Sequence, residues 1–161
     1  MRKYLIVFVL TASSVAAWAW SASATTQPQT FRLTEVSIPK NDRPFGDFTF
    51  DSAPVAGDEF VSRNALYDHG ARVGHSQILH TFITGFGPKF THKATILFVA
   101  QVFVPRGTLL VQGYAPVSPN GPSPLTLPVV GGTGAYADAR GFLNVLKVTG
   151  SKSTLEFHLQ P

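Results

Sequence analysis

The stretch LPVVGGTGAYADARGF at residues 127–142 decides between two very different folds. A hydrophobic run meets Gly132-x-Gly134-x-x-Ala137, which fits the loose glycine pattern of dinucleotide-binding loops. Such a loop needs a helix that begins at the glycines and receives the pyrophosphate, and then a further parallel strand. Here the residues after Gly141 alternate like a strand, and only 27 residues follow Gly134. We therefore interpret the glycines as a close bend between two strands.

Strand-like segments dominate the rest of the chain. They are rich in Phe, Val, Ile and Thr, and turn-forming residues stand at nearly every junction. No window of ten or more residues shows an apolar stripe at helical spacing. A proline-rich loop is expected at 115–124. The predicted strands are 30–38, 46–51, 58–67, 71–87, 91–105, 107–114, 125–130, 141–149 and 153–160.

Many strands with short connections predict an all-β antiparallel meander. In one small domain such a meander either closes into a barrel or folds as a sandwich of two sheets. We expect the barrel, because the long apolar middle strands would be covered on one face and would look into a cavity on the other. The sandwich is the alternative.

The first 24 residues have the pattern of a secretory signal peptide. Two basic residues precede the apolar run 4–10, and small residues end in Ala-Ser-Ala at 22–24. This pattern predicts cleavage after residue 24 and not a membrane anchor. We expect one mature domain at 25–161, secreted to the extracellular space or periplasm, with no membrane span.

The charge and cysteine content of the predicted mature domain exclude two classes of protein. Without Arg2 and Lys3, 11 of the 13 basic residues remain against 9 acidic ones, and they are scattered along the chain. We therefore expect no nucleic-acid partner. The chain has no cysteine, so it forms no disulfide and depends on burial for its stability.

Three motifs resemble those of known families. VVGGTGAYADARG (129–141) resembles the late glycine motif of dirigent proteins and of plant allene oxide cyclases. GDEFVSRNALYDHGARVGHSQ (57–77) and LLVQGY (109–114) are similar to cyclase segments and occur in the same order. Together the motifs span most of 30–160.

This resemblance implies an eight-stranded antiparallel β-barrel, usually assembled as a homotrimer. It also implies a mostly apolar cavity that holds a hydrophobic reactive small molecule, oxylipin-like or phenolic, without a metal or an organic cofactor. In the cyclases the barrel steers the ring closure of a fatty-acid epoxide, and in dirigent proteins it controls how phenoxy radicals or quinone methides couple.

The resemblance to the cyclases implies several site residues. Asn64 stands where the cyclases place an asparagine that helps to hold a water near the epoxide oxygen. Glu35 resembles a glutamate on their first strand, and Pro44 falls near a cyclase Ser-Pro pair. His80 departs from the pattern, because the cyclases carry a pocket cysteine there.

The resemblance to dirigent proteins implies a second set. Asp51 matches an early-strand aspartate and Arg140 matches the arginine after the glycine motif. Ala135 replaces the catalytic acid of that motif, which counts against ordinary dirigent chemistry, although Asp138 lies close in sequence. Arg140 either reaches a substrate group or pairs with one of these aspartates.

The residue types themselves suit the same roles. Glu35 shares a strand face with apolar residues, and a carboxyl group buried on such a face has a raised pKa and can donate a proton. An exposed glutamate on the outward face is the alternative, because parity alone does not say which face is inward. Tyr114 and Tyr136 would bring aromatic rings with polar tips to the barrel mouth, where they could bind substrate.

Asn64 and His80 each have a functional and a structural interpretation. An asparagine can orient a water or a substrate oxygen without ionising, but it is also common on surface turns. His80 shares its face with Ser76, Ile78 and Phe82, where a histidine either transfers protons near neutral pH or packs in the core. Both residues remain candidate catalytic groups.

The histidines do not predict a metal site. His69, His75, His80, His92 and His158 show neither H-x-H nor HExxH spacing, and His75 and His80 should face opposite sides of a strand. A serine hydrolase would need a G-x-S-x-G elbow, which the sequence lacks, and a cysteine nucleophile is excluded.

Three functions remain open. The first is a cofactor-free barrel that controls the cyclisation or stereoselective coupling of its ligand by confinement. The second is a lipocalin-like protein that binds a lipid or phenolic metabolite without changing it. The third is a structural barrel filled by its own side chains.

Overall fold

The computed structural model describes residues 28–87, 91–118 and 124–160. Within them it contains nine β-strands and two single-turn 3₁₀ helices, Pro39–Asn41 and Gly134–Tyr136. No helix in the described part of the chain has the length and apolar character of a membrane span. The strands are β1 (Gln29–Val36), β2 (Arg43–Phe45), β3 (Glu59–Asp68), β4 (Ala71–Thr84), β5 (Ala94–Val104), β6 (Gly107–Val117), β7 (Leu125–Gly132), β8 (Arg140–Thr149) and β9 (Lys152–Gln160).

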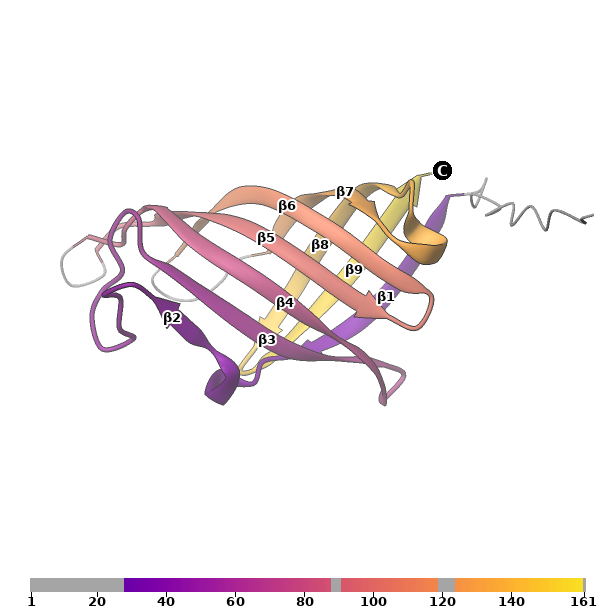
Figure 1. Cartoon of the computed structure of the whole chain (residues 1–161), viewed down its shortest axis with the longest axis horizontal. Helices are drawn as coiled ribbons and strands as arrows, with labels where there is room; N and C mark the ends of the chain where they lie inside the picture. The colour runs from indigo at the N-terminus through magenta and orange to yellow at the C-terminus, as the bar shows by residue number, and fades with distance from the viewer. Residues whose placement is uncertain (1–27, 88–90, 119–123, 161) are drawn as a thin grey trace, which may run out of the picture.

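The strands close into a barrel, as expected from the sequence (Figure 1). From β3 to β9 each strand pairs antiparallel with the next, and β1 pairs with β9. The sheet closes where β1 also pairs with β3, over the three residue pairs Thr34↔Tyr67, Glu35↔Leu66 and Val36↔Ala65. Eight strands form the barrel, and β2 is an additional strand beside β3. The sandwich alternative is therefore wrong.

The glycine motif forms a bend between two antiparallel strands, as predicted. β7 and β8 pair antiparallel on either side of the 3₁₀ turn, so no parallel strand follows the glycines. A Cβ atom on Gly132 would lie 2.3 Å from the carbonyl oxygen of Thr108. Gly134 has a φ of +62°, and a Cβ there would lie 2.6 Å from the carbonyl oxygen of Arg106. Both positions require glycine because the β5–β6 hairpin packs against the bend.

The predicted strand at 46–51 is wrong, and β2 was not predicted. Residues 46–51 form turns, beginning at Gly46 with a φ of +62°. The Phe-Thr-Phe alternation comes from packing at one end of the barrel, because buried Phe48 lies against Phe60 and Phe82 with ring centroids 6.3 Å apart in each case. Alternating apolar residues thus arose here without strand pairing.

The two halves of the barrel interior differ in how completely side chains fill them. Near the end that carries the β5–β6 hairpin, large side chains such as Leu66, Leu109 and Phe157 are completely buried in one cluster. Phe157 also stacks on Phe31, with ring centroids 4.9 Å apart. In the other half several inward side chains are short, including Ser62 and Ser76, and a cavity lies between them and larger side chains such as Phe98. The barrel is therefore packed at one end and hollow in its other half.

Candidate functional site

The hollow half of the barrel contains a cavity of about 480 Å³. Its lining comes from the end of β1, the first half of β3, the second half of β4, the first half of β5 and the corresponding ends of β6 to β9. Because neighbouring strands run antiparallel, all these segments meet in the same half of the barrel. The β8–β9 turn, through Gly150 and Ser151, and the segment after β1, through Ser37 and Asp42, also line it.

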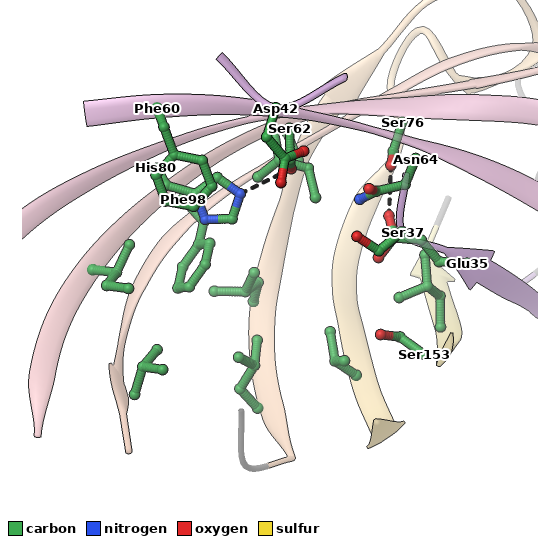
Figure 2. A pocket seen from close by; sticks show the side chains of 18 of the residues that line it. Glu35, Ser37, Asp42, Phe60, Ser62, Asn64, Ser76, His80, Phe98 and Ser153 are labelled. Atoms are coloured by element: carbon green, nitrogen blue, oxygen red, sulfur yellow. Dashed lines mark hydrogen bonds between the residues drawn. The ribbon is translucent and has the colours of Figure 1, made fainter. Parts of the chain in front are cut away.

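The cavity has one polar wall and one aliphatic wall. Polar side chains from β1, β3 and β4 gather along one side (Figure 2). The opposite side is made by β5 to β9 and is mainly aliphatic, although Phe98 on β5 and Ser153 on β9 also line the cavity. Its side chains include Ile96, Val102, Leu127, Leu143 and Leu155. A ligand in this cavity would meet hydrogen-bonding groups on one flank and apolar surface on the other.

Glu35, Ser76 and Asn64 form the first polar group of this wall, which we call the carboxyl cluster. All three side chains are buried, and the Ser76 hydroxyl donates a 2.5 Å hydrogen bond to Oε1 of Glu35. Burial raises the pKa of the Glu35 carboxyl group above its ordinary value, although hydrogen bonds from Ser76 and Asn64 act in the opposite direction. Glu35 therefore holds its proton to a higher pH than an exposed glutamate does.

Asn64 leaves an unused hydrogen-bond acceptor in this cluster. Its Oδ1 atom is buried and has no hydrogen-bond partner within the described part of the chain. An unpaired buried polar atom costs about 1–3 kcal/mol, so such atoms are normally satisfied by a ligand or a water. The carboxyl cluster thus combines a proton donor, the Glu35 carboxyl group, with an unpaired hydrogen-bond acceptor, Oδ1 of Asn64.

His80 and Ser62 form the second polar group, which we call the imidazole pair. Nε2 of His80 lies 3.0 Å from the Ser62 hydroxyl oxygen. The imidazole ring stacks on Phe60 at a centroid distance of 4.1 Å and meets Phe98 edge to face at 5.3 Å. Burial among these rings lowers the pKa of His80 to about 4. The imidazole is therefore neutral at physiological pH.

Asp42 lies at the edge of the cavity, beyond the 3₁₀ turn that follows β1. Its Oδ1 atom is buried without a hydrogen-bond partner among the described residues. Burial raises the pKa of this carboxyl group, and the charge of Arg43 offsets part of that effect. Ser62, Ser76 and Asp42 were not identified from the sequence, since serines on a strand and an aspartate in a loop are common without function.

Of the predicted site residues, Glu35, Asn64 and His80 line the cavity, while the predicted binding residues lie elsewhere. Pro44 is exposed on β2, and Asp51 is exposed in the loop between β2 and β3. Neither side chain is among the residues that line the cavity. Their part in substrate binding stays a prediction from the resemblance.

The other three predicted binding residues also lie outside the cavity. Tyr114 is 75% exposed on the outer face of β6. Tyr136 is buried at the packed end, where its ring lies 6.3 Å from that of Phe31. Arg140 begins β8, is exposed, and donates a 2.8 Å hydrogen bond to the carbonyl oxygen of Ala139.

The histidines are distributed as strand parity predicted. His75 stacks on Phe103 outside the cavity lining, and His80 points into the cavity from the other face of β4. Within residues 28–87, 91–118 and 124–160, no three His, Cys, Asp or Glu side chains gather as a metal site.

Solved structures of other proteins share the fold of this chain. No protein-family model matches the sequence. No curated protein matches it either. Among solved structures, a pyocyanin demethylase covers 82% of this chain and 100% of its own, with a TM-score of 0.67 and 20% identity. An exo-specific intermolecular Diels–Alderase covers 83% and 98%, with a TM-score of 0.61 and 16% identity.

A dirigent protein, the pterocarpan synthase, is similar over 83% of both chains, with a TM-score of 0.59 and 16% identity. These values show a shared fold at low sequence identity. The chain therefore has the antiparallel β-barrel fold found in dirigent proteins and in Diels–Alderase barrels.

Proposed function

We propose that this protein binds a small, largely apolar reactive molecule in its barrel and controls the cyclisation or coupling of that molecule. The observation that carries the proposal is the carboxyl cluster, in which a buried carboxyl group with a raised pKa lies beside an unpaired amide oxygen in an otherwise apolar cavity. Buried polar groups without partners are costly to fold, and they are typical of sites that receive a ligand.

Glu35 is the proposed proton donor. A protonated carboxyl group can donate a hydrogen bond to a carbonyl, epoxide or phenolic oxygen, or transfer its proton to that oxygen as negative charge develops. Ser76 holds the carboxyl group in place through its 2.5 Å hydrogen bond. Asn64 would accept a hydrogen bond from a substrate hydroxyl group or from a water beside the reacting oxygen.

The aliphatic wall supplies the second part of the proposed mechanism, which is confinement. Packing against Val102, Leu127 and Leu143 would hold an apolar chain or ring in one folded conformation and exclude water. A ring closure or cycloaddition only rearranges bonds among the substrate atoms, so it consumes no oxidant or reductant. For radical coupling, the radicals would be formed elsewhere and arrive ready to react.

The structural comparisons support this class of reaction without choosing a substrate. A Diels–Alderase and a dirigent protein are among the similar structures, and both names describe control of bond formation between organic substrates. The demethylase among them performs a different reaction on the same fold. Because one fold serves different reactions, the cavity residues of this chain carry the proposal.

The test begins by identifying small molecules that the protein retains, using native mass spectrometry, and continues with titrations of unsaturated fatty acids and monolignol-type phenols. A bound ligand is then incubated with the protein, and its products are separated on a chiral column. Glu35→Gln should change the product ratio or slow product formation, while the matched control Glu59→Gln, on the outer face, should not. A ligand that binds and leaves unchanged would contradict catalysis and favour a lipocalin-like role.

Asn64→Ala provides a second arm of this test. It should weaken binding of a ligand that carries a hydroxyl group, because the ligand loses its acceptor. Asn144→Ala is the matched control, since Asn144 lies outside the cavity and accepts a 2.7 Å hydrogen bond from Thr126. If neither unsaturated fatty acids nor monolignol-type phenols bind, and no retained molecule is found, the proposed function is contradicted, because it requires a ligand in the barrel.

We also propose that the protein acts outside the cytoplasm after removal of residues 1–24. These residues lie outside the described part of the chain, and the support is their sequence pattern. Amino-terminal sequencing of the protein from the medium or periplasm should find Thr25 first. Retention of the full chain in the cytoplasm would contradict this proposal.

Self-association, as in the homotrimers of the resembling families, is a further proposal. β5 and β6 contain no Asp, Glu, Lys or Arg, and Val99, Leu110 and Tyr114 are exposed on their outer faces. An uncharged apolar surface of this kind favours contact with another protein. Light scattering coupled to size exclusion should report a trimer, and Leu110→Lys should shift it toward the monomer.

A further inference from the structure

The imidazole pair presents a second hydrogen-bonding position inside the same cavity. His80 uses Nε2 toward Ser62, and its other ring nitrogen, Nδ1, has no hydrogen-bond partner among the described residues. Nδ1 is not one of the buried unpaired atoms, so it borders open space, and Figure 2 shows the ring on the cavity side of β4. The stacked Phe60 ring fixes the plane of the imidazole. A ligand group would therefore meet a nitrogen held at a defined position.

The pair can serve either a donor or an acceptor on the ligand. If Ser62 donates to Nε2, the proton of the neutral imidazole is on Nδ1, which then donates to the ligand. If Nε2 donates to Ser62, Nδ1 accepts. A hydroxyl group can match both states, and a carbonyl group matches the first. The imidazole pair thus suits an oxygen function that is not ionised.

The charges of the lining residues also favour an uncharged ligand. The titratable side chains that line the cavity are Glu35, Asp42 and His80, and no Lys or Arg of the described chain is among the lining residues. A buried anion would have no cationic partner here, and any carboxyl group of the lining that ionises would repel it. Burying an unpaired charge is far more costly than burying a neutral polar group.

We propose that the cavity selects an uncharged ligand with two separated hydrogen-bonding groups on an apolar frame, one bound at the carboxyl cluster and the other at the imidazole pair, and that it rejects carboxylates. This inference rests on the proposed function and specifies the substrate class of that site. It favours neutral hydroxylated or carbonyl-bearing molecules over fatty-acid anions.

Three probes that share one frame test the proposal. They are para-phenylphenol, with one hydroxyl group, para,para-biphenyldiol, with a hydroxyl group at each end, and para-hydroxybiphenyl carboxylate, which is anionic at about pH 7. Their dissociation constants are measured by calorimetry with the full chain. The diol should bind about fivefold more tightly than the phenol, from one additional net hydrogen bond. The carboxylate should bind at least about 30-fold more weakly than the diol, because its charge is unpaired.

The variant His80→Phe distinguishes ligand recognition from a structural role. Phenylalanine can keep the stacked ring on Phe60 but has no nitrogen, so the diol and the phenol should then bind equally, while affinity for the phenol stays within about twofold of wild type. If His80→Phe does not fold, His80→Leu also lacks both ring nitrogens and should likewise remove the advantage of the diol.

Three results would overturn the inference. If the carboxylate binds as tightly as the diol, or if His80→Phe weakens diol and phenol equally, the inference is overturned while ligand binding in the barrel stands. If none of the three probes binds, the inference is overturned for this frame, while the titrations with unsaturated fatty acids and monolignol-type phenols decide the proposed function separately.

Discussion

The neutral state of His80 predicts a specific loss of stability in acid. In the folded protein burial lowers the pKa of His80 to about 4, whereas the unfolded chain has the ordinary value of 6.5. Between these two values the unfolded state binds a proton that the folded state does not, so stability falls as the pH drops from 6.5 toward 4. At about 1.4 kcal/mol for each pH unit, the loss is roughly 3 kcal/mol.

The other titratable groups of the cavity supply no counter-charge to a protonated His80. Their raised pKa values favour the folded state in acid, but they do so equally in wild type and in His80→Phe, so they cancel when the two are compared. Burial raises the pKa values of Glu35 and Asp42, so both carboxyl groups become protonated early during acidification. Neither then supplies the negative charge that would stabilise a protonated His80. The imidazole must either stay neutral at this cost or leave the barrel interior.

Urea denaturation of the wild type and of His80→Phe, at several values between pH 7 and pH 4, measures this effect. The wild type should lose about 3 kcal/mol more than the variant over this interval. The cavity variant Leu127→Ala should be less stable at every pH but should keep the wild-type dependence on pH. Equal slopes for wild type and His80→Phe would refute the reasoning, because they would show that His80 is protonated in the folded state as easily as in water.

Three further predictions concern other parts of the barrel. The raised pKa of Glu35 contributes stability that is present below pH 4.5 and is lost as the pH rises through the pKa of Glu35 in the folded protein. Denaturation curves should therefore show the wild type losing stability relative to Glu35→Gln as the pH increases. Phe157→Ala should cost about 3–5 kcal/mol in the same assay, because Phe157 is fully buried, while Phe142→Ala on the outer face should cost about 1 kcal/mol. Gly74→Ala should lower the free energy of unfolding by more than about 2 kcal/mol, since its Cβ would lie 1.9 Å from a backbone oxygen of β5. Gly57→Ala should lower it by only about 1–2 kcal/mol, because Gly57 has a φ of +93° but open space around it.

The barrel was largely predictable because its signals are local. Alternating apolar residues identified every strand of the closed barrel, and the crowded glycines at 131–134 identified the bend between β7 and β8. The same signal failed at 46–51, because Phe48 alternates with polar residues in order to cover one end of the barrel and pairs with no strand. The alternation at 46–51 therefore indicated neither strand pairing nor full burial, because Phe50 is 53% exposed although Phe48 is buried.

Part of the site was predictable from the cyclase-like motifs. Glu35, Asn64 and His80 were proposed from their places in those motifs together with their residue chemistry, and all three line the cavity. Asp42 was missed because its position depends on how the chain turns after β1, which no local pattern records. Tyr114 was expected near the barrel mouth from its place at the end of a strand, but its side chain lies on the outer face, because position along a strand does not state which way a side chain points.

The seam between β1 and β3 links the integrity of the barrel to its chemistry. Glu35 is the middle residue of the three pairs that close the sheet, and its hydrogen bond to Ser76 reaches beyond β3 to β4. If this short junction opened while the longer β-ladders stayed paired, the carboxyl group would be rehydrated and would ionise like any surface glutamate. A transiently open barrel would therefore lose the carboxyl cluster, and the rate at which amides in the β1–β3 pairing exchange with heavy water would set a limit on how long the site stays assembled.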